Sequence, residues 1–86
     1  MAEITIYTRP MCGFCVRAVA LLKKKGVKFT EIDAGWDAAK KKEMIQRSGG
    51  ASTYPQIFVG DVHIGGCDDL LHLEQASKLD AMLAME

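Results

Sequence analysis

Residues 3–26, EITIYTRPMCGFCVRAVALLKKKG, place a strand pattern, a short loop and a helix pattern in one continuous stretch. Apolar and polar residues alternate from 3 to 7, which favours a β-strand, and Pro10 ends that pattern. From 13 to 25 apolar residues recur at three- and four-residue spacing, which predicts one apolar stripe on a helix, and Gly26 is a natural stop. A CxxC pair therefore stands where the strand gives way to the helix.

Beyond residue 26 the sequence predicts a strand, a helix, a hairpin and a last helical region, at 27–32, 37–47, 56–59 with 62–64, and 67–83. The last region has a weak point near 76–77, where the helix pattern is interrupted. The order is βαβαββα, and the first half predicts a βαβ unit with parallel strands. We therefore expect an α/β fold with a mixed four-stranded sheet flanked by helices.

Length and charge narrow the class of protein. A chain of 86 residues is long enough for one domain and too short for two, so we expect a single domain over 1–86. Its 11 basic and 11 acidic residues cancel, which gives no electrostatic reason to bind nucleic acid or an anionic membrane. The sequence shows no membrane-spanning run, and its start, MAEITIYTRP, lacks the features of a secretion signal. We expect a cytoplasmic protein that meets small molecules or other proteins.

Three cysteines, at 12, 15 and 67, carry the chemistry of the chain. A CxxC pair can hold a metal ion, form a structural disulfide or exchange electrons, and a reducing compartment disfavours the structural disulfide. A zinc site needs about four ligands, and only Cys67, His63 and His72 are available to complete one. At a helix start, unpaired N–H groups favour a thiolate at Cys12 and lower its pKa, while Cys15 lies within disulfide reach as the resolving thiol.

Three segments, YTRPMCGFC, TYPQIF and HIGGCDDL, in this order and on these elements, resemble the glutaredoxins, above all the small bacterial dithiol type. The resemblance covers essentially the whole chain. It implies a thioredoxin-like fold and a glutathione-dependent thiol–disulfide oxidoreductase that reduces protein disulfides and glutathione mixed disulfides. Glutathione would be the reductant and co-substrate, and the partners would be disulfide-containing or glutathionylated proteins meeting a monomer.

The resemblance assigns roles to the loop before the third strand. It implies a cis bond between Tyr54 and Pro55 that faces the first thiol, and leaves the Tyr54 backbone free to pair with a peptide-like ligand. Thr53 would shape this loop beside the site. Tyr54 departs from the usual Thr-Val-Pro of the family, a change that spares backbone pairing and bears on ligand affinity and access.

The Gly-Gly-Cys-Asp-Asp segment would form the other side of the site. Gly66 opens the last helix, whose free N–H groups suit the γ-glutamyl carboxylate of glutathione. By the resemblance, Asp68 or Asp69 would meet the neighbouring ammonium; read alone, both aspartates also fit helix caps. Cys67 is expected to be a buried thiol close to the site that catalysis does not require.

Charged and aromatic side chains complete the expected site. By the resemblance, Arg9 and Lys41 would meet the glycyl carboxylate, although Lys41 within KKK also fits a solvated helix face. Phe14, between the two cysteines, is expected to be exposed near the ligand. Trp36, at the start of a helix, is expected to pack against the fold.

An iron–sulfur role is the alternative function. CGFC differs from the cluster-carrying CGFS signature only at the second thiol, and Gly13 stands where the usual CPYC has proline. In this reading Cys12 would ligate a [2Fe–2S] cluster that two protomers share, with glutathione supplying further thiolates.

Overall fold

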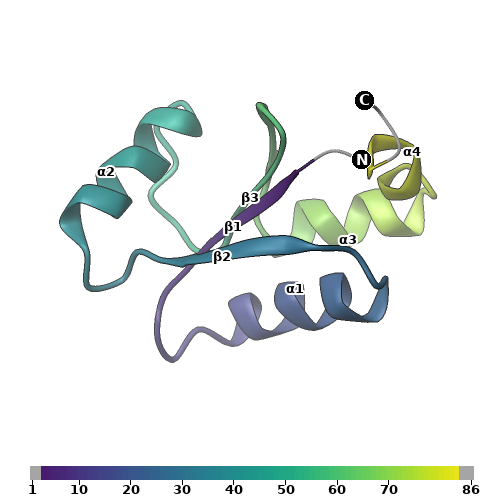
Figure 1. The fold of residues 1–86 in the computed structure, drawn as a ribbon, viewed down its shortest axis with the longest axis horizontal. Coiled ribbons are helices and arrows are strands. Elements are labelled where there is room, and N and C mark those ends of the chain that lie inside the picture. The colour runs from purple at the N-terminus through teal and green to yellow at the C-terminus, as the bar shows by residue number, and fades with distance from the viewer. Residues whose placement is uncertain (1–2, 84–86) are drawn as a thin grey trace.

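The computed structural model describes residues 3–83, and its centre is a sheet in the strand order β2-β1-β3-β4 (Figure 1). The strands are β1 (Ile4–Thr8), β2 (Phe29–Asp33), β3 (Gln56–Val59) and β4 (Val62–Gly65). β1 pairs with β2 in parallel, and β3 runs antiparallel to both β1 and β4. The predicted mixed four-stranded sheet is confirmed, with strand ends shifted by at most two residues.

Within residues 3–83, helices cover both faces of the sheet: α1 (Gly13–Lys24), α2 (Ala38–Arg47), α3 (Cys67–Gln75) and α4 (Leu79–Leu83). Figure 1 shows α2 on one side of the sheet and the other three helices on the opposite side. Alternate side chains of a strand point to opposite faces. Ile4 and Ile6 of β1 accordingly pack in the core with α1 and α3, whereas Tyr7 packs with Met44 of α2. None of these helices is both long and apolar enough to cross a membrane.

The contacts of Tyr7 fix α2 to the sheet. Its hydroxyl donates to Glu43 Oε2 at 2.7 Å and accepts from Arg47 Nη1 at 2.9 Å. The Arg47 guanidinium also lies over the Phe58 ring, with Cζ 4.4 Å from the centroid. Burial raises the pKa of Tyr7, so the phenol stays protonated as a donor at neutral pH. These polar contacts hold a helix whose other side chains are mostly exposed.

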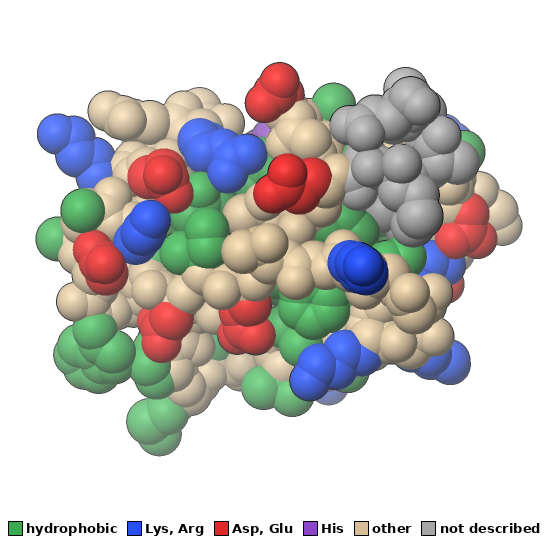
Figure 2. Space-filling model, viewed as in Figure 1, with side chains coloured by type: hydrophobic (Ala, Val, Ile, Leu, Met, Phe, Trp, Pro, Cys, Tyr) green, Lys and Arg blue, Asp and Glu red, His purple; other side chains and the backbone are tan. Residues whose placement is uncertain are grey.

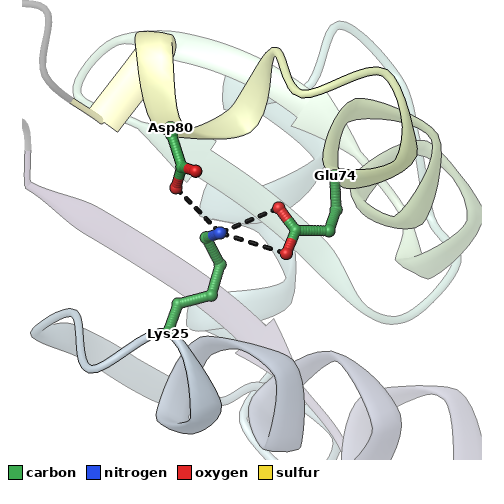
Figure 3. A network of polar contacts seen from close by, with 3 residues as sticks. All are labelled: Lys25, Glu74 and Asp80. Carbon is green, nitrogen blue, oxygen red and sulfur yellow. Dashed lines mark hydrogen bonds and ion pairs between the residues drawn. The ribbon is translucent and has the colours of Figure 1, made fainter.

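The last helical region consists of two helices, and the break between them lies where the interruption of the helix pattern predicted it. Ser77 adopts a φ of 59°, and the Lys78 N–H donates to the Leu73 carbonyl at 2.8 Å, which closes the end of α3. Lys25, just after α1, then joins the two pieces: its Nζ lies 2.8 Å from both Glu74 of α3 and Asp80 of α4 (Figure 3).

Two loops, β1–α1 and β2–α2, pack closely at one end of the molecule. A Cβ on Gly35 would lie 2.7 Å from both Arg9 Cβ and Pro10 Cδ, so only glycine allows this approach. The expectation that Trp36 packs against the fold is wrong, because 87% of its side chain is exposed. Gly35 and the buried Ala34 supply the contacts of this loop, and the next side chain turns outward. Figure 2 shows hydrophobic side chains protruding at this corner.

Candidate functional site

The two cysteines of the CxxC pair lie directly after β1. Cys12 is the N-cap of α1, one position before the expected first turn, and Cys15 lies within that turn. They form a disulfide, with Cα atoms 5.2 Å apart, and the Cys15 N–H donates to Cys12 Sγ at 3.2 Å. This N–H and the positive end of the helix both stabilise negative charge on Cys12 Sγ when the disulfide opens. The pair is therefore placed for reversible thiol–disulfide exchange.

Exposed apolar side chains flank this disulfide. Met11 is fully exposed, and the exposed fractions of Phe14 and Val16 are 56% and 68%. The two sulfurs themselves belong to residues that are almost covered, at 8% for Cys12 and 4% for Cys15. Such an apolar rim beside a covered reactive group is typical of a surface that meets other molecules.

The loop before β3 holds the cis bond between Tyr54 and Pro55 that the resemblance implied. Buried Gln56 braces this loop, because its amide nitrogen donates to both the carbonyl and the hydroxyl of Thr53, at 3.1 and 3.0 Å. The other end of that amide, Oε1, lies 2.6 Å from His63 Nε2. Since the Gln56 oxygen can only accept, the His63 nitrogen must be the donor. His63 on β4 therefore holds the Gln56 side chain, which in turn holds Thr53 in position.

The start of α3 combines a helix cap with a buried thiol. The Gly66 N–H donates to Asp69 Oδ2 at 3.0 Å, so Asp69 caps this helix. Capping was one of the two roles that the sequence analysis considered for this residue. Asp68 is exposed and makes no such contact among the described residues. Cys67 is buried, as expected, and burial followed by the charge of Asp68 raises its pKa. Its thiol is therefore held protonated and away from solvent.

These two segments and Phe14 line one hollow of about 330 Å³, named here the Pro55 hollow. Eight of the expected site residues lie around it: Phe14, Thr53, Tyr54, Pro55, Gly66, Cys67, Asp68 and Asp69. The structure therefore brings together, from the loop before β3, α1 and α3, most of the residues that the three sequence motifs indicated.

A second hollow, of about 560 Å³, runs between α1 and the edge strand β2 and is named here the α1–β2 groove. Cys12, Cys15 and Arg9 line it, together with Val16. Arg9 reaches toward the other hollow only through its contact with the Tyr54 ring, whose centroid lies 5.9 Å from Cζ. Lys41 is exposed on α2 and lines neither hollow, so the structure does not bring it to the expected site.

Sequence reasoning missed two residues of the Pro55 hollow. His63 was considered only for a zinc site, and Gln56 was given no role, yet both line this hollow and fix Thr53. The signal was weak, because a glutamine next to a proline and a histidine in a strand have many uses. Only the pairing of β3 with β4 makes them neighbours.

The sequence profile of the glutaredoxin family matches residues 4–64, which include the CxxC pair and the cis-proline loop. This chain belongs to the glutaredoxin family. The family explains why a cysteine pair, a cis-proline loop and a helix start meet here, and the fold is the thioredoxin-like fold that the resemblance implied.

Individual glutaredoxins are similar over nearly the whole chain. Glutaredoxin 3 of Escherichia coli K12 is 52% identical over 83 residues, which are 96% of this chain and 99% of that protein. The solution structure of a glutaredoxin from Brucella melitensis is 54% identical, with a TM-score of 0.83 over 96% of this chain and 89% of that one. A buckwheat glutaredoxin in complex with glutathione is 29% identical, with a TM-score of 0.83 over 93% and 74% of the two chains.

Proposed function

We propose that this glutaredoxin is a glutathione-dependent thiol–disulfide oxidoreductase. The observation that carries this function is the Cys12–Cys15 disulfide at the start of α1. The similarity to a glutaredoxin that binds glutathione supports glutathione as the co-substrate.

The chemistry starts at Cys12. Its thiolate, stabilised by the Cys15 N–H and the helix start, attacks the glutathione sulfur of a mixed disulfide and releases the substrate thiolate. A second glutathione thiolate then attacks the new Cys12–glutathione disulfide, which yields oxidised glutathione and restores Cys12. With a protein disulfide, Cys12 forms the mixed disulfide and Cys15 displaces the substrate, leaving the Cys12–Cys15 disulfide that two glutathiones reduce.

The glutathione moiety is proposed to lie in the Pro55 hollow. The Tyr54 backbone would pair with it as an added strand, and the N–H groups at the start of α3 would bind the γ-glutamyl carboxylate. Asp68, whose carboxylate is exposed, would meet the ammonium, since Asp69 is engaged by Gly66. Arg9 would take the glycyl carboxylate, whereas Lys41, which lines neither hollow, is left out of the proposed site.

Proteins with disulfides or bound glutathione are the proposed substrates. The exposed side chains of Met11, Phe14 and Val16 support this, because an apolar rim suits a protein surface better than a free tripeptide. We further propose that the chain acts as one domain over 1–86, as a monomer, in the cytoplasm. A reducing compartment is where glutathione keeps such a pair turning over.

The iron–sulfur alternative has less support. A [2Fe–2S] cluster takes four thiolates. Among residues 3–83 no group of three or more cysteine, histidine or acidic side chains is gathered to hold a metal ion. The shared cluster considered above would take only Cys12 from each protomer, with glutathione supplying the other thiolates, and in this structure Cys12 is bonded to Cys15 instead.

The test is glutathione-dependent turnover of the cysteine–glutathione mixed disulfide by the wild type, Cys12→Ser and Cys15→Ser. Loss of turnover in Cys12→Ser and retention in Cys15→Ser are expected, because the first thiol alone completes this cycle. Negligible turnover by the wild type would contradict the proposed function.

A further inference from the structure

Tyr54 joins three segments of the site through its side chain. Its hydroxyl donates to the Ala34 carbonyl in the β2–α2 loop at 3.1 Å. Its half-buried ring packs against the cluster that contains Ala34 and Met44, and burial raises its pKa, so the phenol remains a donor at neutral pH. The ring is therefore fixed in place, whereas the valine usual in the family has neither a hydroxyl nor an aromatic face.

The fixed ring carries the Arg9 guanidinium on its face. Arg9 Cζ lies 5.9 Å from the ring centroid, within the range of a cation–π contact. Among the hydrogen bonds and ion pairs of residues 3–83, none involves the Arg9 guanidinium. Its N–H donors are thus open to a ligand while its position is set by Tyr54.

The stem of Arg9 is held from the other side. Gly35 approaches so closely that a Cβ added to it would lie 2.7 Å from Arg9 Cβ. The Gly35 N–H also donates a hydrogen bond to Asp33 Oδ1 at 3.0 Å. The Arg9 side chain therefore lies between a tight glycine contact at its base and an aromatic face at its head.

We propose that Tyr54 is a positioning residue that holds the Arg9 guanidinium ready for the glycyl carboxylate of the bound glutathione moiety. This inference rests on the proposed function. Arginine loses much side-chain freedom when it binds a ligand, and a guanidinium already held in place loses less. Because the contact does not involve the sulfurs, its loss should raise KM and leave kcat unchanged.

The matched pair Tyr54→Leu and Tyr54→Phe isolates the aromatic face, since both lose the hydroxyl and only leucine loses the ring. With the cysteine–glutathione mixed disulfide, Tyr54→Leu is expected to raise KM roughly two- to fivefold above Tyr54→Phe, the size of an exposed cation–π contact. In an Arg9→Ala background the same pair should differ little. Lys28→Ala, at an exposed lysine that lines neither hollow, controls for loss of positive charge.

The second arm uses the mixed disulfide of cysteine with γ-glutamylcysteine, which lacks the glycine. The difference between Tyr54→Leu and Tyr54→Phe should disappear with it. Equal KM values for the two variants on the glutathione substrate, or an unchanged difference without Arg9 or without the glycyl carboxylate, would overturn the inference. Absence of wild-type turnover would instead overturn the proposed function, so the two failures are distinct.

Discussion

Two neighbouring residues at the start of α3 have different roles, one in stabilising the helix and the other, as proposed, in binding glutathione. Asp68 and Asp69 are adjacent carboxylates, yet Asp69 Oδ2 accepts the Gly66 N–H at 3.0 Å and Asp68 is left to solvent. The same charge therefore serves as a helix cap in one residue and as a proposed ligand group in the other.

Alanine substitutions separate these two roles. Asp69→Ala is expected to lower the free energy of unfolding by about 1 kcal/mol, as loss of a helix cap does, whereas Asp68→Ala leaves it nearly unchanged. Asp68→Ala is expected to raise KM for a glutathione mixed disulfide. Denaturant unfolding and steady-state kinetics on both variants check this, and a reversal of the two patterns would refute the division.

The residue roles could be predicted only in part. Cys12 and Cys15 follow from CxxC spacing and the helix start, which are local features of the chain, whereas the buried Cys67 was expected from the family resemblance. Which aspartate caps α3 depends on side-chain direction, and the use of His63 depends on the pairing of β3 with β4. Neither the capping role of Asp69 nor the contact of His63 can be predicted from the local sequence.

At the scale of elements, the first half of α1 turns one face to the core and leaves Val16 exposed in the α1–β2 groove. Val62 on β4 is a matched exposed valine, at 53%, that lines neither hollow. If proteins are the substrates, Val16 should contribute to docking them and Val62 should not.

Val16→Asn is expected to raise KM for a glutathionylated protein roughly three- to tenfold, because complete burial of a valine contributes about 1.5 kcal/mol, or slightly more than tenfold, and a docked protein covers only part of this side chain. The small cysteine–glutathione disulfide should be turned over as by the wild type, and Val62→Asn should change neither. Parallel kinetics with both substrates provide the check. Equal losses on the two substrates would speak against a protein-docking role for this part of α1.

The elements themselves were largely predictable, because alternation and helical spacing reflect burial directly. The strand ends shifted by at most two residues, and the break at Ser77 fell where the helix pattern weakened. Trp36 was mispredicted because its exposure is decided by Gly35 packing on Arg9, a contact between loops far apart in sequence.

At the scale of the whole molecule, Lys25 links the end of α1 to α3 and α4 (Figure 3). Hydrogen bonds to Asp80 and Glu74 raise the pKa of Lys25. A raised lysine pKa contributes stability below its ordinary value of about 10.4, and that contribution disappears as pH rises through the raised pKa.

Lys25→Met is accordingly expected to lower the midpoint of denaturant unfolding at pH 7, with the difference from the wild type narrowing as pH rises beyond the raised pKa. Lys24→Met, at an exposed neighbour, removes the same charge with little effect. Unfolding curves across alkaline pH test this, and a difference that stays constant with pH would exclude the charged network as its cause.

The central claim is that Cys12, of the three cysteines, carries the glutathione moiety. The most direct test treats reduced Cys15→Ser with oxidised glutathione and maps the adduct by peptide mass spectrometry. One glutathione on Cys12 and none on Cys67 is the predicted result, because burial and the charge of Asp68 raise the pKa of Cys67 and leave little thiolate there. An unmodified Cys12, or glutathione on Cys67 instead, would contradict the account.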